Sequence, residues 1–333
     1  MKSNPPTSAF QSFFEEFKQA PRFRLLGQHF DDISRGIKQV PNQAVLANEA
    51  FLTQDSELSR YHQLYQKNMG TFWHHYCASI PFIIEEYCRI GVTISKLARQ
   101  SKIGEHFTFY EMTSADGTDA RTLAEYAQGN IHTLTDSLNP SNQNTFQRLC
   151  NHPYSQFYLG PFIDITPEFI LSRADLSQFH QGFDVIRENA TFQFYGRNRQ
   201  EQIAYVSRLL KDNGLMFFME KLKQPDLHEY NKREMIKDRD FKLNFFNDDE
   251  IIWKKEKMLD DIESCQVSFD QLVNAIGHHF EHIYLLWNST NFYELVASNS
   301  HATIELFISL LPSPYIPSLF RFEGDLLTPR KIK

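Results

Sequence analysis

Two acidic side chains stand directly after short apolar runs, in places suited to contact a nucleotide-like ligand. Glu111 follows the run 107–110, and Asp136 follows the run 131–135. A carboxylate accepts hydrogen bonds through both of its oxygens, so Asp136 suits the two hydroxyl groups of a ribose. We therefore expect a nucleotide site near these two acids, provided that the two runs are neighbouring strands.

The residues between the two acids have the pattern of a βαβ unit. The run 107–110 is rich in β-branched and aromatic residues, and small residues follow it as far as Gly117. A helical stretch over 118–127 is closed by Gly129, and the second apolar run comes next. The turn after the first strand of such a unit binds nucleotides, because free helix N–H groups and the helix dipole meet there. An α/β turn that binds nothing is the alternative.

The order of residues resembles motif I of the class I S-adenosylmethionine-dependent methyltransferases, which is an acid followed by Gly-x-Gly-x-Gly. Glu111 stands at the acid, while Thr113, Ala115 and Gly117 stand at the three glycine positions. Two of these positions depart from glycine, the residue that readily adopts positive φ. The resemblance implies that these four residues bind S-adenosylmethionine, with Asp136 on the ribose.

A third strand is predicted over 156–164, ending in Asp164. In the methyltransferase pattern, an acid near the end of this strand accepts a hydrogen bond from the adenine amino group. The alternative is that Asp164 caps the turn before Thr166, which with Pro167 begins a helix. The sequence leaves both roles of Asp164 open.

The stretch 183–195 resembles motif IV of small-molecule methyltransferases. Its strand 183–186 leads to Asn189, which matches the motif and is expected near the cofactor. Phe192 and Gln193 stand where Leu-His-His is common, so we expect them on the substrate side. Glutamine cannot take a proton at neutral pH, which leaves Glu188 as one candidate for a general base.

Residues 1–100 read as a helical N-terminal extension that forms a lid over the catalytic domain. Its most informative segment is 72–76, in which aromatic and imidazole side chains cluster. Trp73 and Tyr76 are candidate substrate contacts, and His74 and His75 are candidate bases because histidine titrates near neutral pH. Ordinary amphipathic packing of this segment is the alternative.

The C-terminal half supplies the remaining elements of the sheet. A helix over 199–211, ended by 212–214, leads to a fifth strand at 215–220 that is apolar throughout. The segment 221–275 mixes charges of both signs, which predicts solvated helix faces, and it stands where the family often carries a substrate-covering insertion. Strands at 283–287 and 292–298 predict an antiparallel end to the sheet.

His278 and His282 would share one face of a helix before the sixth strand, at a spacing that could ligate a metal. No third ligand is indicated, so we expect no metal site. The four cysteines show no C-x-x-C spacing, which argues against a zinc knuckle or a disulfide scaffold.

The amino-acid composition limits the classes of molecule that we expect the protein to bind. The net charge of -7 argues against nucleic acid, because phosphate binding requires a basic face. No apolar run is long enough to span a membrane, so we expect a cytoplasmic protein without membrane contact. The 30 Phe and 14 Tyr residues favour a small, partly aromatic or apolar acceptor. A homodimer stays open.

These features predict a Rossmann-like α/β fold with a seven-stranded, mostly parallel sheet, an antiparallel last strand and an N-terminal helical cap. The resemblance implies a class I methyltransferase domain over 101–333, with a charged insertion near 221–275, that methylates oxygen or nitrogen of a small molecule. One alternative is a catalytically inactive methyltransferase fold that acts as a binding or scaffold protein. A NAD-dependent oxidoreductase also begins with βαβ, but the terminal hairpin argues against it.

Overall fold

The protein is built on one central sheet. In a computed structural model, residues 10–20, 26–100, 106–324 and 326–333 are described. The strands are β1 (Phe107–Met112), β2 (Ile131–Ser137), β3 (Ser155–Leu159), β4 (Phe183–Asn189), β5 (Leu210–Lys221), β6 (His282–Ser289), β7 (Phe292–Ser298) and β8 (Arg330–Lys331). They lie in the order β3-β2-β1-β4-β5-β7-β6-β8.

The direction of the strands confirms the predicted fold class. The strands β3, β2, β1, β4 and β5 are parallel to one another, while β7 is antiparallel to both β5 and β6. The chain therefore has the Rossmann-like sheet with an antiparallel seventh strand that the sequence predicts. The predicted number of seven strands is wrong by one, because the C-terminal residues pair with β6 as the short strand β8.

The helices occupy the connections between strands and most of the N-terminal third. They are α1 (Gln11–Gln19), α3 (Leu26–Ser34), α4 (Glu49–Leu52), α5 (Ser56–Asn68), α6 (Thr71–Cys77), α7 (Ile83–Ala98), α8 (Thr118–Tyr126), α9 (Pro140–Leu149), α10 (Pro167–Ser172), α11 (Arg199–Val206), α12 (Leu227–Asp240), α13 (Asp248–Lys254), α14 (Asp260–Glu263), α15 (Phe269–Gly277) and α16 (His301–Leu310). None of these helices, in the described part of the chain, has the length and apolar character needed to cross a membrane.

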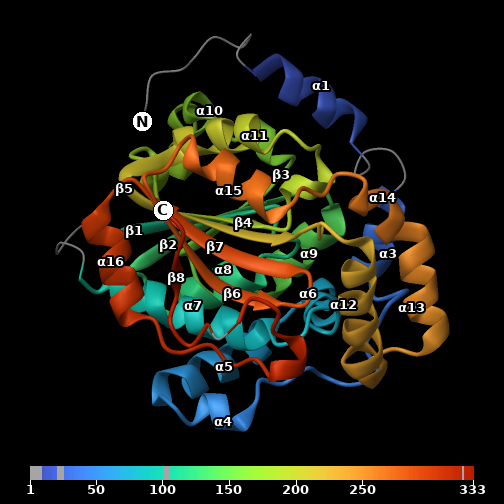
Figure 1. The fold of residues 1–333 in the computed structure, drawn as a ribbon. Helices are drawn as coiled ribbons and strands as arrows, with labels where there is room; N and C mark the ends of the chain where they lie inside the picture. Colours follow the sequence, from blue (N-terminus) through green and yellow to red (C-terminus); the bar gives the residue numbers. More distant parts are fainter. Residues whose placement is uncertain (1–9, 21–25, 101–105, 325) are drawn as a thin grey trace.

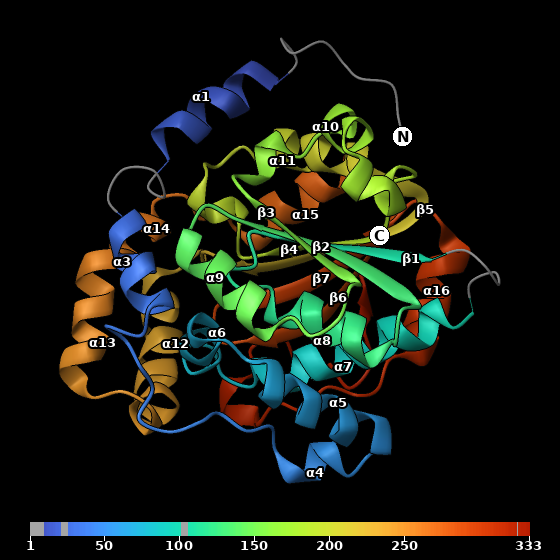
Figure 2. The same cartoon turned by 180° about the vertical axis from the view of Figure 1, so that it is seen from behind.

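Helices cover both faces of the sheet, as strands that are apolar throughout require. One layer contains α5, α7, α8 and α16, and the opposite layer contains α10, α11 and α15 with α1 outside them (Figure 1, Figure 2). Two large hydrophobic clusters fill the spaces between these layers and the sheet. The sheet is therefore buried on both sides.

The N-terminal helices are part of the main core. Side chains of α5 and α7, such as Tyr65 and Ile84, share one hydrophobic cluster with Phe109 of β1 and Phe217 of β5. The boundary expected at residue 100 therefore does not coincide with a break in the core. The arrangement places α6, the helix that contains the segment 72–76, beside the carboxyl ends of the strands.

Two local predictions are wrong. The helix expected over 199–211 ends earlier, with one 3₁₀ turn (Ser207–Leu209), and 212–214 lie inside β5. Leu210 already pairs with Phe183 of β4, so strand pairing starts where the sequence pattern still favoured a helix. His282 begins β6, so it does not share a helical face with His278.

The turn between β1 and α8 has an unusual backbone. Thr113, Ala115 and Gly117 have φ values of 48°, 47° and 68°. These are the three positions that align with glycine in motif I, and all three adopt the left-handed region that glycine favours. For a β-branched residue such as Thr113 this conformation is a strained outlier, which the surrounding contacts must stabilise.

A substitution at Gly117 can test this geometry. Any other residue there would adopt an unfavourable positive φ, and its side chain would also collide with a neighbouring residue. A Cβ atom at Gly117 would lie 2.7 Å from Thr135 Cγ2. Gly324 also has positive φ (77°), but a Cβ atom there would meet nothing within 4 Å.

We predict that Gly117→Ala lowers the free energy of unfolding by about 2–4 kcal/mol, because strain and overpacking add. The matched variant Gly324→Ala should lose only the strain, about 1–2 kcal/mol. Urea denaturation of both variants measures the difference. Equal losses would contradict the crowding of Gly117 against Thr135.

Candidate active site

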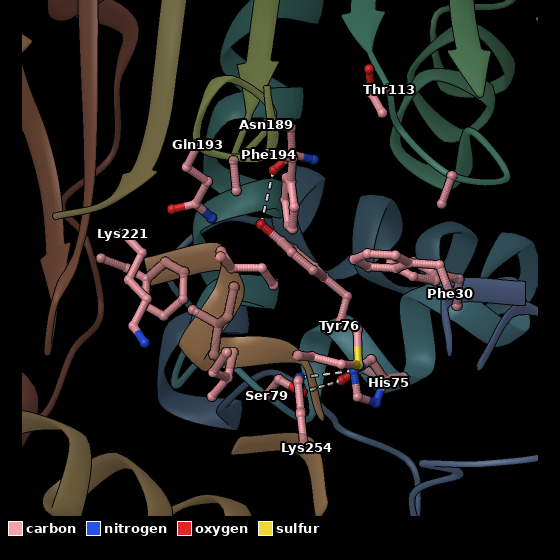
Figure 3. A pocket seen from close by; sticks show the side chains of 18 of the residues that line it. Phe30, His75, Tyr76, Ser79, Thr113, Asn189, Gln193, Phe194, Lys221 and Lys254 are labelled. Atoms are coloured by element: carbon pink, nitrogen blue, oxygen red, sulfur yellow. Dashed lines mark hydrogen bonds between the residues drawn. The ribbon is translucent and has the colours of Figure 1, made fainter. Parts of the chain in front are cut away.

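A deep cavity lies at the carboxyl ends of β1, β2, β4 and β5. Its empty volume is about 1040 Å³ with its open mouth included. The walls include Thr113 and Ala115 from the strained turn, Asn189 and Gln193 from the loop after β4, and His75 and Tyr76 from α6 (Figure 3). The structure thus brings residues from three predicted motifs to one cavity.

Asp136 holds the turn after β1 and does not line the cavity. Its Oδ1 accepts hydrogen bonds from Thr113 N at 2.9 Å and from Tyr110 OH at 2.7 Å. Its Oδ2 accepts from Thr113 Oγ1 at 3.3 Å, and the side chain is fully buried. Burial raises the pKa of Asp136 to about 7, although the three donors favour the charged form. The carboxylate is thus used to fix Thr113.

Two polar residues beside Asp136 do line the cavity, and the sequence analysis missed them. Ser137 is the last residue of β2, and Asn142 lies in the first turn of α9. Asn142 Nδ2 donates to Ser137 Oγ at 3.0 Å. The position of Ser137, one residue after the acid at a strand end, is the signal that could have found it.

Asn189 is held from several sides. Its Oδ1 accepts from Tyr76 OH at 2.9 Å and from Tyr87 OH at 2.7 Å, and its Nδ2 donates to Glu111 Oε1 at 3.2 Å. Glu111 itself is fully buried and its Oε2 accepts from Ala120 N at 3.2 Å. Burial raises the pKa of Glu111, and the charge of Asp119 raises it further. Glu111 therefore positions Asn189 and the start of α8 from behind the cavity.

A buried ion-pair network supports these residues. Arg187, on β4, donates to Asp119 at 3.0 Å and to Glu294 at 2.6 Å, and its guanidinium lies 4.1 Å from the centroid of the Tyr87 ring. Removing one member of such a network leaves an unpaired buried charge, which is strongly destabilising. The network thus fixes Tyr87, and through it Asn189.

Of the site residues predicted in and before the loop after β4, some line the cavity and others do not. Gln193 lines the cavity and is 4% exposed, and its Oε1 has no hydrogen-bond partner among the residues that the structure describes. Phe192 packs in a hydrophobic cluster with Met112 and Phe218 and does not line the cavity. Glu188 Oε1 accepts from the backbone N–H groups of Thr191 and Phe192. Glu188 therefore shapes the loop and is not brought to the cavity.

The site residues predicted in helix α6 also differ in whether they line the cavity. His75 is 3% exposed and lines the cavity, and its Nδ1 lies 3.1 Å from the carbonyl oxygen of Gln39. A carbonyl can only accept, so Nδ1 carries the proton. His74 does not line the cavity, and Trp73 is turned to the strained turn, where its Nε1 donates to Ser114 O at 3.3 Å. Burial lowers the pKa of both histidines.

Asp164 lies outside the cavity. It is exposed at the end of a 3₁₀ turn (Phe162–Asp164), and its Oδ2 accepts from Tyr158 OH at 3.0 Å. Its backbone carbonyl accepts from Thr166 N at 3.0 Å. The adenine contact stays a prediction, while these bonds agree with the alternative in which Asp164 closes the turn before α10.

The roof of the cavity joins segments that are far apart in the sequence. Phe30 of α3, Phe194 of the loop after β4 and Met258 of a π-helical turn (Lys255–Leu259) pack together in a small hydrophobic cluster. All three line the cavity. Single π-helical turns are frequent at functional sites. The N-terminal region and the charged insertion thus cover the cavity together.

The insertion is less solvated than its composition predicts. Lys221, Lys237 and Lys242 are 2%, 3% and 2% exposed, and with Lys254 they line the cavity. The interpretation of 221–275 as solvated helix faces is therefore wrong for these side chains. Across the described residues, no group of three or more His, Cys, Asp and Glu side chains is arranged to hold a metal.

The buried carboxylate of Asp136 predicts how stability depends on pH. Its pKa is raised from 3.8 to about 7, so between these values the folded protein keeps a proton that the unfolded chain releases. Stability from this group is therefore lost as pH rises from 4 to 7, by at most about 1.4 kcal/mol per pH unit.

Asp136→Asn should make the decline in unfolding free energy between pH 5 and pH 7 less steep. Urea denaturation at several pH values measures this slope, and the exposed Asp212→Asn is the control, expected to keep the original slope. An unchanged slope in Asp136→Asn would exclude a proton on Asp136 in the folded state.

No protein-family model and no curated protein matches this chain. Solved methyltransferase structures are similar to it at low identity. The plantazolicin methyltransferase BpumL in complex with SAH is 10% identical and has a TM-score of 0.47, with 87% of this chain and 100% of that chain covered. An O-methyltransferase family protein from Burkholderia thailandensis is 8% identical and has a TM-score of 0.39, with 75% and 68% covered. The CurJ carbon methyltransferase is 12% identical and has a TM-score of 0.41, with 76% and 70% covered. At these low scores the function must be argued from the site's own residues.

Proposed function

We propose that this protein is an S-adenosylmethionine-dependent methyltransferase that acts on oxygen or nitrogen of a small, partly aromatic or apolar molecule. The observation that carries the proposal is the turn after β1. Thr113 and Ala115 adopt the positive φ of the motif I glycines although neither residue favours it. Strain of this kind persists where surrounding contacts over-determine it, which is typical of binding sites.

The residues around this turn fit the cofactor. Thr113, Ala115, Ser137 and Asn142 line the part of the cavity that β1 and β2 form, and they offer small side chains and polar atoms. Asp136 contributes through the turn that it holds, not as a direct ligand of the ribose. Asn189 stands between this part of the cavity and the side lined by α6.

When bound, S-adenosylmethionine supplies a methyl group on a sulfonium, which is transferred with inversion to a nucleophile held in line. The protein must align the acceptor with the methyl group and exclude water. Both contributions lower the activation barrier without a further reacting group. Tyr76 and Asn189 can orient a polar atom of the acceptor, since both line the cavity and share a hydrogen bond. Phe30, Phe194 and Met258 form the apolar cover.

The alternative is an inactive binding or scaffold protein. It is suggested by Thr113 and Ala115, which stand at two glycine positions of motif I. Their positions keep the glycine-type backbone through Asp136 and Trp73, which weakens that objection. The cavity also contains the buried Oε1 of Gln193, which has no partner within the described ranges of the chain and is costly unless a ligand uses it. These two observations favour an active site over a vestigial one.

Binding of S-adenosylhomocysteine tests the cofactor part of the proposal. Ala115→Leu keeps the backbone strain but fills the cavity, so we predict a loss of at least about tenfold in affinity. Isothermal titration calorimetry measures it, with the exposed Ala174→Leu as the control that should bind normally. Normal binding by a folded Ala115→Leu variant would place the cofactor elsewhere.

Transfer of labelled methyl groups tests the acceptor class. The acidic net charge of -7 and the largely apolar roof favour a small molecule over nucleic acid. We therefore predict labelled products in a metabolite extract and none in bulk tRNA or DNA. Label in nucleic acid, with none in metabolites, would refute the proposed acceptor class.

A further inference from the structure

Four lysine side chains form one wall of the cavity, which is unusual for a site with an apolar roof. They are Lys221, Lys237, Lys242 and Lys254, and they come from β5, from α12 and the turn after it, and from α13. A buried ammonium group is costly unless an anion pairs with it. A lysine in this wall that has no carboxylate partner is therefore a place where the anionic group of a ligand can bind.

Three of the four lysines have carboxylate partners. The pairs are Lys221 with Glu234 and Glu263 at 2.8 Å each, Lys237 with Glu234, and Lys242 with Asp238 at 2.9 Å. The wall thus contains four lysines and three carboxylates, and the first three lysines each form an ion pair.

Lys254 has no carboxylate partner in the described part of the chain. Its Nζ lies 2.8 Å from His75 Nε2 and 2.8 Å from Ser79 Oγ (Figure 3). His75 donates through Nδ1 to Gln39 O, so its Nε2 can only accept from Lys254. Ser79 donates to His75 O at 2.7 Å, so its oxygen also accepts from Lys254. Lys254 has three N–H groups when it is an ammonium ion, and these two contacts use two of them. The third has no acceptor among the residues that the structure describes and can bind a ligand.

The surroundings of Lys254 demand an anion. Burial lowers the pKa of Lys254 well below its usual range, and the charges of Lys242, Lys237 and Lys221 lower it further. An anion that entered the cavity would offset this excess of positive charge and make the ammonium form favourable. Neutral ligands would offer no such compensation.

The rest of the cavity defines the remainder of the ligand. Phe30, Phe194, Met258 and Leu259 form apolar walls that suit an aromatic or aliphatic body. The buried Oε1 of Gln193 has no partner in the described part of the chain and can accept a hydrogen bond from an O–H or N–H group. In Figure 3, Lys254 lies on the opposite side of the cavity from Thr113 and Asn189, so a ligand on Lys254 can extend toward the cofactor side.

We propose that the methyl acceptor carries one anionic group, a carboxylate or a phosphate, on an aromatic or apolar body, and that Lys254 binds this group. The inference rests on the proposed function, because it names the substrate class of that same cavity. His75 and Ser79 are positioning residues, which aim the ammonium group at the ligand.

Anion binding should be accompanied by proton uptake, because Lys254 changes from amine to ammonium. The charged and titratable groups facing it are His75 on α6, Lys221 on β5, Lys237 and Asp238 on α12, and Lys242 after α12. At pH 7.5 we expect uptake of up to one proton per bound anion. Calorimetry in two buffers of different ionisation enthalpy measures this number.

The affinity test uses benzoate, phenyl phosphate and the neutral benzamide, titrated into protein saturated with S-adenosylhomocysteine. We expect both anions to bind at least about tenfold more tightly than benzamide. Lys254→Met, which keeps the length of the side chain, should abolish this preference and the proton uptake, with unchanged affinity for S-adenosylhomocysteine. Lys255→Met, at the exposed neighbouring position, is the matched control and should behave as the original protein.

Equal affinity for benzoate, phenyl phosphate and benzamide in the original protein would overturn the inference, and this comparison needs no variant. Retention of the anion preference by Lys254→Met would overturn it as well. If only one of the two anions shows the preference, that result identifies the anionic group. Failure of the original protein to bind S-adenosylhomocysteine would instead overturn the proposed function.

Discussion

The site depends on one buried carboxylate. Asp136 accepts hydrogen bonds from the backbone and side chain of Thr113 and from Tyr110, and it thereby holds a β-branched residue in a backbone conformation that it otherwise avoids. Trp73 supports the same turn through Ser114. Because these bonds are shielded from water, each is strong, and loss of any one leaves a buried polar group unsatisfied. The strained turn is thus an outcome of tertiary contacts, not of local preference.

A second layer of buried charge fixes the opposite side of the turn. Arg187 joins Asp119 and Glu294, while Glu86 pairs with Arg89 at 2.6 Å. Burial raises the pKa of Glu294 to about 8, and the nearby Glu86 adds to this effect. Isolated buried ion pairs add little stability, but a connected network imposes one geometry. Here that geometry sets the ring of Tyr87 and the amide of Asn189.

The cover of the cavity is assembled from both ends of the chain. α3 and α6 come from the N-terminal third, while α13 and the π-helical turn come from the insertion after β5 (Figure 1, Figure 2). Phe30 and Met258 belong to a small hydrophobic cluster between these segments, and Lys254 of α13 also lies 2.8 Å from His75 of α6. The cover therefore combines apolar packing with a polar contact, and both join the N-terminal third to the insertion.

The sequence by itself determined the sheet, because the evidence for strands and turns is local. Apolar runs, the acid at each strand end and the glycine after α8 were sufficient to place β1, α8 and β2, and the terminal hairpin was recognisable in the same way. Only tertiary structure decided which side chains face the cavity. In the sequence Asp136 looks like a cofactor ligand and Glu188 like a general base, but both accept hydrogen bonds from backbone N–H groups. Lys254 looks like part of a solvated helix, yet its Nζ lies 2.8 Å from His75 Nε2. The reason is physical: a charged side chain near a strand end or on an amphipathic helix has the same local pattern whether water or protein covers it. What covers it comes from other elements, as in the contact of Lys254 with His75, 179 positions away.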